Sequence, residues 1–471
     1  MRVTLGRENI ILSEIARACG GILVGKDRTL HAVCTDSREA DKETMFVALR
    51  GERTDGHRYI SGAVERGCCA VLCESWLPLG DASAVIVKNT EHALCRLAEF
   101  YLDQQRIPCV AVTGSVGKTT TKEFVAAVLS SELSVYKTVG NYNSTVGMPL
   151  SALEITPAHR AAVFEMGMSG QGEIARMSRA AKPDIAVITN IGSSHLEYLE
   201  TRENIAKAKL EITQGLRDGG LLLLNGDEPL LRGVGSSSYR VQTVTLDGDG
   251  DYRGCNIVLH PGEECTTFDL YTPDGILKDF RIPAVGKHMV YDAIFAYVVG
   301  KEMGLDENSI RQGLLTYRSG GLRQRLLPMG DITVLEDCYN AAPESMRAAL
   351  YVLGSFARER HCRSIAVLGD MRELGMETRY LHEQIGVYAV EQGISVLMTL
   401  GELGASIAEG AMGAGLNDDC VLMHRDLSDL DSAAELLLSR LESGDMVLVK
   451  ASRGVAAERL IEALRRHLQQ E

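Results

Sequence analysis

The stretch "CVAVTGSVGKTTTKEFVAAVL", from Cys109 to Leu129, constrains the fold of this chain more than any other part of it. An apolar run leads into two closely spaced glycines, and Lys118, Thr119 and a helical pattern follow. A strand, a tight turn and a helix whose first N–H groups point outward together form a binding site for phosphate. The common motif G-x-x-x-x-G-K-[ST] would require glycine at Val112, however, and the nearest upstream glycine is Gly114.

Each part of the stretch nevertheless suits a phosphate site. Gly114 and Gly117 are free to take positive φ in the turn. The segment after them has the apolar stripe of a helix packed on a sheet, made of Phe124, Val125, Val128 and Leu129. We expect Lys118 to reach the β- and γ-phosphates of a nucleotide and the Thr119 hydroxyl to bind Mg²⁺. The alternative is a Gly-Ser turn before a surface helix, but strand, turn, Lys-Thr pair and helix all agree with the phosphate site.

Length and charge limit the remaining possibilities. A chain of 471 residues suggests two to four domains, at roughly 100–200 residues each. The net charge of −14 argues against a nucleic-acid binder that depends on phosphate contacts. The start of the chain lacks a signal-peptide pattern and no run of about 18 apolar residues occurs, so we expect no membrane insertion.

The twelve cysteines give no sign of a metal site. No pair of C-x-x-C units occurs among them, which argues against structural zinc. Free thiols fit a reducing compartment, so a cytoplasmic location is expected. The simplest interpretation is that the cysteines are small buried apolar residues.

The chain divides into three parts, and all three have α/β patterns. Residues 1–105 alternate short apolar runs with helical segments, as a small α/β domain would. Residues 106–316 hold four apolar runs that predict parallel strands of a doubly wound, P-loop NTPase-like sheet; they are Cys109–Thr113, Ala161–Glu165, Ile185–Asn190 and Leu221–Asn225. Shorter, turn-rich alternation between residues 239 and 286 predicts an antiparallel insertion. Residues 317–471 repeat the doubly wound pattern and predict a Rossmann-like domain.

Polar side chains end several of the predicted strands. Glu165 ends one, Asn190 ends the next, and His195 follows five residues later. Ligands of such sheets bind at the carboxyl ends of the strands, and Mg²⁺ needs oxygen ligands beyond one hydroxyl. Glu165 is therefore a candidate metal ligand, whereas His195 is equally compatible with a loop histidine and with a ligand.

A series of motifs in a fixed order resembles a known family. The segments are "TGSVGKTTTK", "GNYNSTVGMPL", "EMGMSGQGEI", "ITNIGSSHLEYLETRENIAKAKLEI", "GKHMVYDAIFA", "DCYNAAPESM", "LGDMRELG" and "LVKASRG". They resemble the Mur ligases, ATP-dependent amide-forming enzymes of peptidoglycan precursor synthesis, along essentially the whole chain. That family uses a shortened G-x-x-G-K-[ST] loop, which accounts for Val112.

The resemblance implies a reaction. "TDSREADKETMFVALRGERTDGHRYISGAVERGCCAVL" is similar to a UDP-sugar-binding N-terminal domain, and the D-x-Y-N-A and L-G-D-M signatures are similar to those of the members that use a dipeptide. The expected substrates are UDP-N-acetylmuramoyl-tripeptide, with lysine or meso-diaminopimelate third, and D-alanyl-D-alanine. ATP and Mg²⁺ are the expected cofactors, and a monomer is expected.

The family pattern also implies roles for individual residues near the phosphates. The ATP phosphates would sit on Gly114, Ser115, Val116, Gly117, Lys118, Thr119 and Thr120. Thr119 and Glu165 would hold one Mg²⁺, and His195 would help to hold a second. Lys209, with Lys207 as the competing candidate, matches a lysine that is carbamylated in many members and then acts as a metal-binding anion. Arg325 would approach the γ-phosphate.

Further roles concern the nucleoside and the other substrates. Asp337 would reach the ribose, with Tyr339 and Asn340 lining the same cleft. The adenine-binding helix departs from the family pattern at Met289 and Asp292, so Asp292 is expected to accept from the exocyclic amine. The expected substrate-binding residues are Ser37 and Arg38 for the uridine diphosphate, Asn141 and Asn143 for the acyl phosphate, and Lys450, Ser452 and Arg453 for the peptide.

Other functions stay open on the sequence alone. Another ligase of the same architecture, adding a single amino acid or acting as a folylpolyglutamate synthase, is the nearest alternative. A P-loop NTPase without ligase activity, or an inactive scaffold, is more distant, because it would leave the first and third parts unexplained. Gly320 and Gly321 predict a hinge between the second and third domains.

Overall fold

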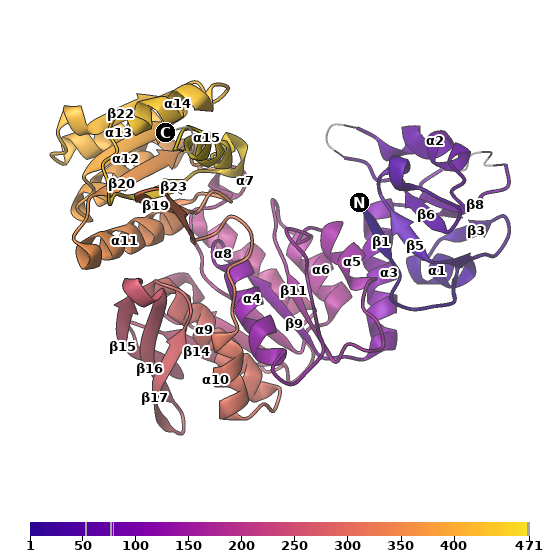
Figure 1. The fold of residues 1–471 in the computed structure, drawn as a ribbon. Coiled ribbons are helices and arrows are strands. Elements are labelled where there is room, and N and C mark those ends of the chain that lie inside the picture. The colour runs from indigo at the N-terminus through magenta and orange to yellow at the C-terminus, as the bar shows by residue number, and fades with distance from the viewer. Residues whose placement is uncertain (52–53, 76–77, 79, 469–471) are drawn as a thin grey trace.

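The computed structural model describes residues 1–51, 54–75, 78 and 80–468. It consists of three α/β domains, each with its own main sheet, and the central domain lies between the other two (Figure 1). The α/β class and the three-part organisation predicted from the sequence are confirmed. The boundaries at residues 105/106 and 316/317 stay predictions.

The N-terminal domain is built on a six-stranded sheet in the order β1-β5-β6-β7-β8-β3, in which β5 to β8 are parallel. Its strands are β1 (Arg2–Thr4), β3 (Ile22–Val24), β5 (Ala32–Cys34), β6 (Thr44–Val47), β7 (Ala70–Cys73) and β8 (Ser83–Ile86), with β2 (Ile10–Ile11) and β4 (Thr29–Leu30) as a separate pair. Its helices are α1 (Leu12–Cys19), α2 (Ile60–Glu65) and α3 (Thr90–Gln105).

The central domain has a nine-stranded sheet in the order β10-β11-β9-β12-β13-β14-β15-β16-β17. Its strands are β9 (Cys109–Thr113), β10 (Val135–Lys137), β11 (Ala161–Glu165), β12 (Ile185–Ile188), β13 (Leu221–Asn225), β14 (Arg240–Thr245), β15 (Tyr252–His260), β16 (Cys265–Thr272) and β17 (Gly275–Ile282). Its helices are α4 (Lys118–Leu129), α5 (Gly147–Ala152), α6 (Glu173–Ala181), α7 (Leu196–Leu199), α8 (Arg202–Leu210), α9 (Lys287–Glu302) and α10 (Glu307–Leu315).

Two predictions for this sheet need correction. The third predicted strand ends at Ile188, before the polar residues. The predicted antiparallel insertion is shorter than expected, because β14 pairs parallel with β13 and with β15, and only β15, β16 and β17 pair antiparallel. The sequence of β14 alternates like that of a hairpin strand. The reason is that most of β14 is only half-buried, and only its last two residues are fully buried.

The C-terminal domain has a six-stranded sheet in the order β18-β19-β23-β20-β21-β22, parallel except for β18 at the edge. Its strands are β18 (Arg325–Met329), β19 (Ile332–Glu336), β20 (Ser364–Gly369), β21 (Val396–Leu400), β22 (Val421–His424) and β23 (Met446–Lys450). Its helices are α11 (Pro343–Arg360), α12 (Thr378–Glu391), α13 (Gly404–Gly413), α14 (Leu430–Leu438) and α15 (Glu458–Leu468).

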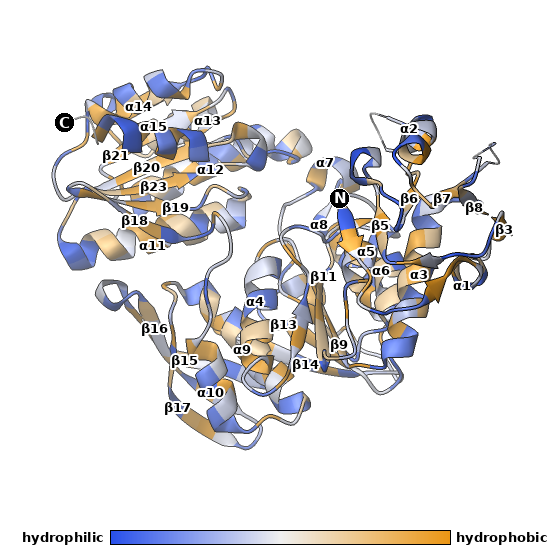
Figure 2. Cartoon of the chain, turned by 45° about the vertical axis from the view of Figure 1, so that its right-hand side comes forward, coloured by the Kyte–Doolittle hydropathy of each residue, from blue (hydrophilic) through white to orange (hydrophobic). Residues whose placement is uncertain are grey.

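Hydrophobic residues are concentrated on the strands of the sheets and on parts of the helices that cover them (Figure 2), and the buried apolar residues form continuous clusters. One continuous cluster runs from the N-terminal domain through α3 to one face of the central sheet, and the Tyr101 hydroxyl of α3 donates to the Ile155 carbonyl, 2.7 Å away. The C-terminal core takes in only Val285 and Leu259 from the central domain, as far as the described residues show. The first interface is therefore part of a core, whereas the second is small and more polar.

Candidate active site

The glycines of the loop between β9 and α4 have the conformations that a phosphate loop needs. Gly114 has φ of 152°, and a Cβ built there would lie 1.8 Å from Oγ1 of Thr189. Gly117 has φ of 83° and immediately precedes α4. Both positions therefore exclude larger residues, which explains the glycines, and α4 begins at Lys118 as predicted.

Thr189 and Asn190, which directly follow strand β12 beside β9, hold this loop in place. The amide of Ser115 donates to the Asn190 carbonyl at 3.1 Å, and the amide of Val116 donates to Asn190 Oδ1 at 3.0 Å. The Thr189 hydroxyl donates to the Val116 carbonyl at 2.5 Å. These contacts fix the loop before any nucleotide is bound.

Lys118 lies over the loop that precedes it. Its ammonium donates to the carbonyls of Gly114, at 2.8 Å, and Ser115, at 3.2 Å. Burial lowers the pKa of Lys118, while the nearby Glu165 raises it. A phosphate group beside Lys118 would stabilise its charged form more than the two carbonyls do, because each carbonyl carries only a partial charge.

Glu165 is the centre of a second polar group beside the loop. It is 2% exposed, and its carboxylate accepts from the Thr119 hydroxyl at 2.8 Å and from Asn143 Nδ2 at 2.7 Å. The Lys122 ammonium lies 3.8 Å away. A buried carboxylate beside a hydroxyl at the edge of an open cavity offers two of the oxygen ligands that Mg²⁺ takes alongside phosphate and water. These residues therefore fit the ion.

A cavity of about 490 Å³ lies in front of the loop, between the central and C-terminal domains. The phosphate loop, Glu165, Asn143 and His195 line it from the central domain. Asp337, Tyr339, Asn340 and Lys450 line it from the C-terminal domain. The structure thus brings together residues that are up to 335 positions apart in the chain, from Ser115 to Lys450.

Arg325 is not among these residues. Its Nε lies 3.2 Å from Glu336 on the next strand, and its side chain is 54% exposed. Arg323 occupies the expected place instead, because its Nη2 donates to the Thr119 hydroxyl at 3.1 Å and its guanidinium lies 4.0 Å from the centre of the Tyr339 ring. Gln324 between them has φ of 43°, so the chain turns here, and simple strand alternation could not separate the two arginines.

Asp337 forms a buried ion pair at the C-terminal side of the cavity. The Lys450 ammonium donates to Asp337 Oδ2 at 2.6 Å and to the Asn340 carbonyl at 3.0 Å. Both side chains come from the carboxyl ends of neighbouring parallel strands, β19 and β23. The Ser452 hydroxyl donates to the Ala341 carbonyl at 3.4 Å, whereas Arg453 pairs with Glu458 at 2.6 Å.

Helix α9 contributes two titratable residues to the cavity, the buried Asp292 and the half-buried His288. Asp292 accepts from the Thr121 hydroxyl at 2.5 Å, and burial raises its pKa to about 8. Burial lowers the pKa of His288 to about 4, and His288 Nε2 lies 3.1 Å from Gln324 Nε2. Asp292 thus lies beneath the start of α4, so its expected contact with adenine stays a prediction.

The two candidate lysines of α8 differ in burial. Lys207 is exposed, whereas Lys209 is 1% exposed. Among the described residues, no carboxylate lies within salt-bridge distance of the Lys209 ammonium, and burial together with the charge of Lys118 holds the pKa of Lys209 well below its usual value. A lowered pKa favours the neutral amine, which is the form of lysine that reacts with CO₂.

His195 reaches the cavity from the turn before α7. Its Nδ1 lies 2.6 Å from Glu373 of the C-terminal domain, so Nε2 is the ring nitrogen left for a ligand in the cavity. Ser193, two residues earlier, donates its amide and its hydroxyl to Glu344 at the start of α11. The sequence interpretation passed over both glutamates, because each becomes significant only through a contact between domains.

The remaining predicted substrate residues lie outside this cavity. Asn141 is exposed and does not line it. Ser37 and Arg38 follow β5 in the N-terminal domain, where the Arg38 guanidinium donates to Asp36 at 2.6 Å. The structure therefore separates a candidate nucleotide site from a second polar region in the first domain.

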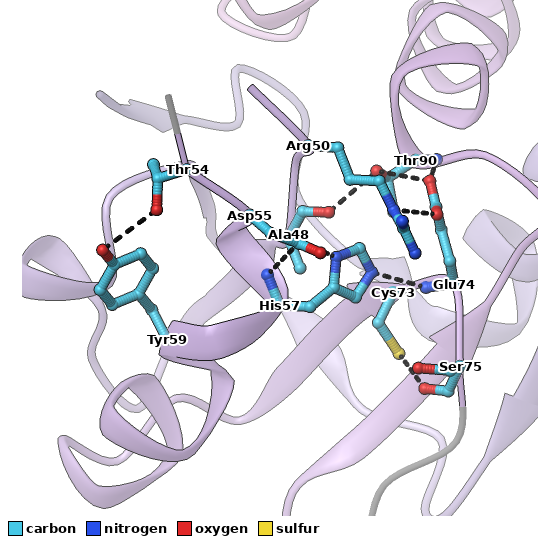
Figure 3. A network of polar contacts seen from close by, with 10 residues as sticks. All are labelled: Ala48, Arg50, Thr54, Asp55, His57, Tyr59, Cys73, Glu74, Ser75 and Thr90. Atoms are coloured by element: carbon cyan, nitrogen blue, oxygen red, sulfur yellow. Dashed lines mark hydrogen bonds and ion pairs between the residues drawn. The ribbon is translucent and has the colours of Figure 1, made fainter. Parts of the chain in front are cut away.

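That second region lies at the carboxyl ends of β5, β6 and β7, where α/β sheets bind ligands. Figure 3 shows the polar network among the residues that follow β6 and β7. Glu74 accepts from Arg50 Nε at 2.7 Å and from the Thr90 amide at 3.1 Å. His57 Nε2 accepts from the Glu74 amide, so Nδ1 carries the proton and donates to Asp55 at 2.7 Å. The network fixes residues 54–59 against the sheet.

Comparison with protein families gives a match along most of the chain. The matching descriptions are "Mur ligase family, catalytic domain" over residues 29–105, "Mur ligase middle domain" over residues 112–300, and "Mur ligase, glutamate ligase domain" over residues 323–453. The UDP-N-acetylmuramoyl-tripeptide--D-alanyl-D-alanine ligase of Bacillus subtilis (strain 168) is 39% identical over 460 residues, which cover 96% of this chain and 98% of that protein.

Solved structures agree with this match. MurF from Acinetobacter baumannii superposes with a TM-score of 0.88 at 28% identity and covers 98% of this chain and 100% of that chain. The MurF ligase from Thermotoga maritima in complex with ADP superposes with a TM-score of 0.82 at 28% identity, covering 93% of this chain and 98% of that one. No helix in the described part of the chain is both long and apolar enough to cross a membrane.

Proposed function

The chain belongs to the Mur ligase family, and on that premise we propose that it is the ATP-dependent ligase that joins D-alanyl-D-alanine to UDP-N-acetylmuramoyl-tripeptide. The match to the Bacillus subtilis ligase of that name, over nearly the full length of both chains, is the observation that carries the proposal. The geometry supports it, since a phosphate loop, a buried carboxylate and a cavity between two domains are what such a reaction requires. We further propose a cytoplasmic monomer that does not bind nucleic acid.

The reaction begins with activation of the peptide carboxylate, because a carboxylate and an amine do not condense in neutral water. The terminal carboxylate of the tripeptide attacks the γ-phosphate of ATP, which displaces ADP and forms an acyl phosphate. Two anions must approach each other in this step, so Lys118 and Arg323 lower the barrier by neutralising phosphate charge. Mg²⁺ would add further charge neutralisation when bound, with Thr119 and Glu165 holding one ion and His195 helping to hold a second.

The second step forms the amide. The free amine of D-alanyl-D-alanine attacks the acyl carbon, and phosphate leaves with the oxygen that bridged it to that carbon. Water would compete for the acyl phosphate, so the site must exclude it. Closing the C-terminal domain over the cavity supplies that exclusion, and Asn143 beside Glu165 faces the reacting groups.

The other substrate contacts follow from the surrounding domains. The polar edge of the N-terminal sheet, with Ser37 and Arg38, is proposed to bind the UDP portion. Lys450 contacts only Oδ2 of Asp337, and we propose that the other carboxylate oxygen accepts from the ribose hydroxyls. Lys450 and Ser452 lie where the peptide would meet the C-terminal domain.

We propose that Lys209 is carbamylated. A carbamate would convert a buried amine into an anion beside Lys118, whose charge would then stabilise it instead of opposing it. Activity of Lys209→Ala that is restored by added short-chain carboxylates is the expected result. Full activity without such additives would contradict the assignment.

Cosubstrate dependence tests the proposed function. Phosphate release is measured with ATP and UDP-N-acetylmuramoyl-tripeptide, together with either D-alanyl-D-alanine or a single amino acid. Release that requires both the tripeptide and the dipeptide is expected. Release with a single amino acid would favour another Mur-type ligase or a folylpolyglutamate synthase, and release from ATP alone would favour a simple NTPase.

A further inference from the structure

One short segment of the central domain, Gly192–Glu197, meets the C-terminal domain at two points; we call it the docking segment. At the first point, Glu344 Oε1 accepts from the amide of Ser193 at 2.8 Å and from its hydroxyl at 3.0 Å. The approach depends on a missing side chain, because a Cβ built on Gly192 would lie 2.6 Å from the carboxyl carbon of Glu344. The two domains therefore touch closely here.

The second contact lies at the other end of the docking segment. His195 Nδ1 is 2.6 Å from Glu373 Oε2, and the amide of Glu197 donates to the Glu373 carbonyl at 3.1 Å. A Cβ built on Gly375, which has φ of 57°, would lie 3.2 Å from the Cα of Glu197. Each contact point thus combines a carboxylate with a glycine that permits close approach.

The residues that meet at the second contact both have an unusual backbone. His195 has φ of 70° and Glu373 has φ of 63°, in the left-handed region that non-glycine residues rarely occupy. Such conformations persist where the surrounding structure enforces them, and they concentrate at functional sites. The loop that carries Glu373 is enforced, because Met371 donates its amide to His382 and Arg372 donates its amide to Ser452.

The docking segment is also tied to the phosphate loop. The amide of Gly192 donates to the Ser115 hydroxyl at 2.8 Å, so adjacent amides, on Gly192 and Ser193, bind the phosphate loop and the C-terminal domain respectively. His195 lines the nucleotide cavity two residues later. Any displacement of the C-terminal domain must therefore release contacts within a few residues of the phosphates.

From these contacts we infer that Glu344 and Glu373 are positioning residues of the C-terminal domain that complete the phosphate site when the domains close. Glu373 orients the His195 ring, so that Nε2 faces the cavity, and Glu344 holds Ser193, so that the docking segment keeps the phosphate loop in register. The inference rests on the proposed ligase function. Closure of the C-terminal domain would then do more than exclude water, because it would also bring these two carboxylates into contact with the phosphate site.

The polarity of the interface supports this role. The N-terminal domain shares a continuous apolar core with the central sheet, whereas the contacts at the docking segment are hydrogen bonds and a close histidine–carboxylate contact. Polar groups of this kind are solvated when domains separate, so the contacts can break and reform without exposing a core. A carboxylate that orients a histidine from behind commonly affects metal affinity or activity by about 10- to 100-fold.

The test compares Glu344→Ala, Glu344→Gln, Glu373→Ala and Glu377→Ala, of which the last alters an exposed glutamate on the same C-terminal loop. Glu344→Ala and Glu373→Ala are expected to lower kcat by about 10- to 100-fold while the Kd of a non-hydrolysable ATP analogue changes little. Glu373→Ala should also raise the Mg²⁺ concentration needed for half-maximal activity. Glu344→Gln keeps an acceptor for Ser193 and should recover most of the activity.

Hydrogen–deuterium exchange provides a readout that does not depend on catalysis. Glu344→Ala should speed exchange at the Ser193 amide, with peptides of the C-terminal core unchanged, which also shows that the variant is folded. The inference would be overturned by wild-type kcat in both alanine variants or by equal losses of kcat in Glu344→Ala and Glu344→Gln. Unchanged exchange at residues 192–197 would also overturn it. Phosphate release by the wild-type enzyme without the dipeptide would instead refute the proposed function. The exchange experiment would still test the contact between Glu344 and Ser193, because it does not depend on catalysis.

Discussion

At the scale of single residues, the clearest difference lies between Arg323 and Arg325. Their spacing suggests equivalent positions, yet one contacts Thr119 in the phosphate site and the other pairs with Glu336 at the edge of the C-terminal sheet. Electrostatic stabilisation of transferred phosphate requires contact with the site. We therefore propose that Arg323, which contacts Thr119, acts on the γ-phosphate in place of Arg325.

Arg323→Ala should lower kcat by about 10²- to 10³-fold, as expected when a donor to developing charge is removed. Steady-state phosphate release with saturating substrates measures it. Arg325→Ala is the matched control, and it should lower the midpoint of thermal unfolding, because buried Glu336 loses its cation, while kcat stays close to wild type. A larger loss of kcat in Arg325→Ala than in Arg323→Ala would return the role to Arg325.

Asp292 gives the stability of the protein a definite pH dependence. Burial raises its folded-state pKa to about 8, whereas in the unfolded chain the carboxyl ionises near pH 4. The folded state therefore holds a proton that the unfolded state has lost, so stability falls as pH rises through this interval and levels off above about pH 8. His288 acts on the acid side, since its folded pKa of about 4 means that stability falls as pH drops below about 6.5.

Asp292→Asn should raise the midpoint of chemical unfolding at pH 7 to 9 and leave it unchanged at pH 4, because only the ionised carboxyl is penalised by burial. Unfolding curves at pH 4, 7 and 9 measure the difference. His288→Gln is the comparison, with its gain confined to acid pH. A gain for Asp292→Asn that does not depend on pH would show that the carboxyl is not held protonated.

At the scale of elements, the sequence predicted the strand, turn and helix of the phosphate loop well. The reason is local, since glycine conformations, the Lys-Thr pair and the buried stripe of α4 all lie within 21 consecutive residues. The direction in which β14 pairs was harder to predict. Its half-buried pattern does not specify a partner, and its pairing with β13 depends on the assembled sheet. Glu344 and Glu373 could not be predicted from sequence, since their partners lie 151 and 178 positions away.

Gly114→Ala tests whether the loop geometry is required. The added Cβ would meet the Thr189 hydroxyl, so the loop must shift or bear strain of about 1–3 kcal/mol. The Kd of an ATP analogue, measured by calorimetry, should rise accordingly. Gly235→Ala, at a glycine with open space around it, should leave the Kd unchanged; a similar effect in both variants would argue against a loop preformed by Thr189.

At the scale of the whole molecule, the three domains are joined unequally. The apolar core shared through α3 makes the N-terminal and central domains one unit, whereas the C-terminal domain meets the central domain across a cavity, a few polar contacts and the apolar side chains of Val285 and Leu259. Gly320 and Gly321 lie in the connection, and Gly321 has φ of 66°. We propose that the C-terminal domain rotates about this connection to open and close the site.

Stiffening the connection should impair closure without affecting the nucleotide site itself. In the variant Gly320→Ala combined with Gly321→Ala, kcat should fall while the Kd of an ATP analogue stays the same. Small-angle X-ray scattering should show the wild-type enzyme becoming more compact on addition of the analogue and UDP-N-acetylmuramoyl-tripeptide, and the variant doing so less. Equal compaction and equal kcat would place the hinge elsewhere.

The central claim is that ATP activates the peptide carboxylate as an acyl phosphate, and transfer of isotope measures this directly. UDP-N-acetylmuramoyl-tripeptide labelled with ¹⁸O in its terminal carboxylate is converted with ATP and D-alanyl-D-alanine, and the released phosphate is analysed by mass spectrometry. One ¹⁸O atom is expected in the phosphate released with each amide formed, because the bridging oxygen leaves with phosphorus. Amide formation accompanied by unlabelled phosphate would contradict it.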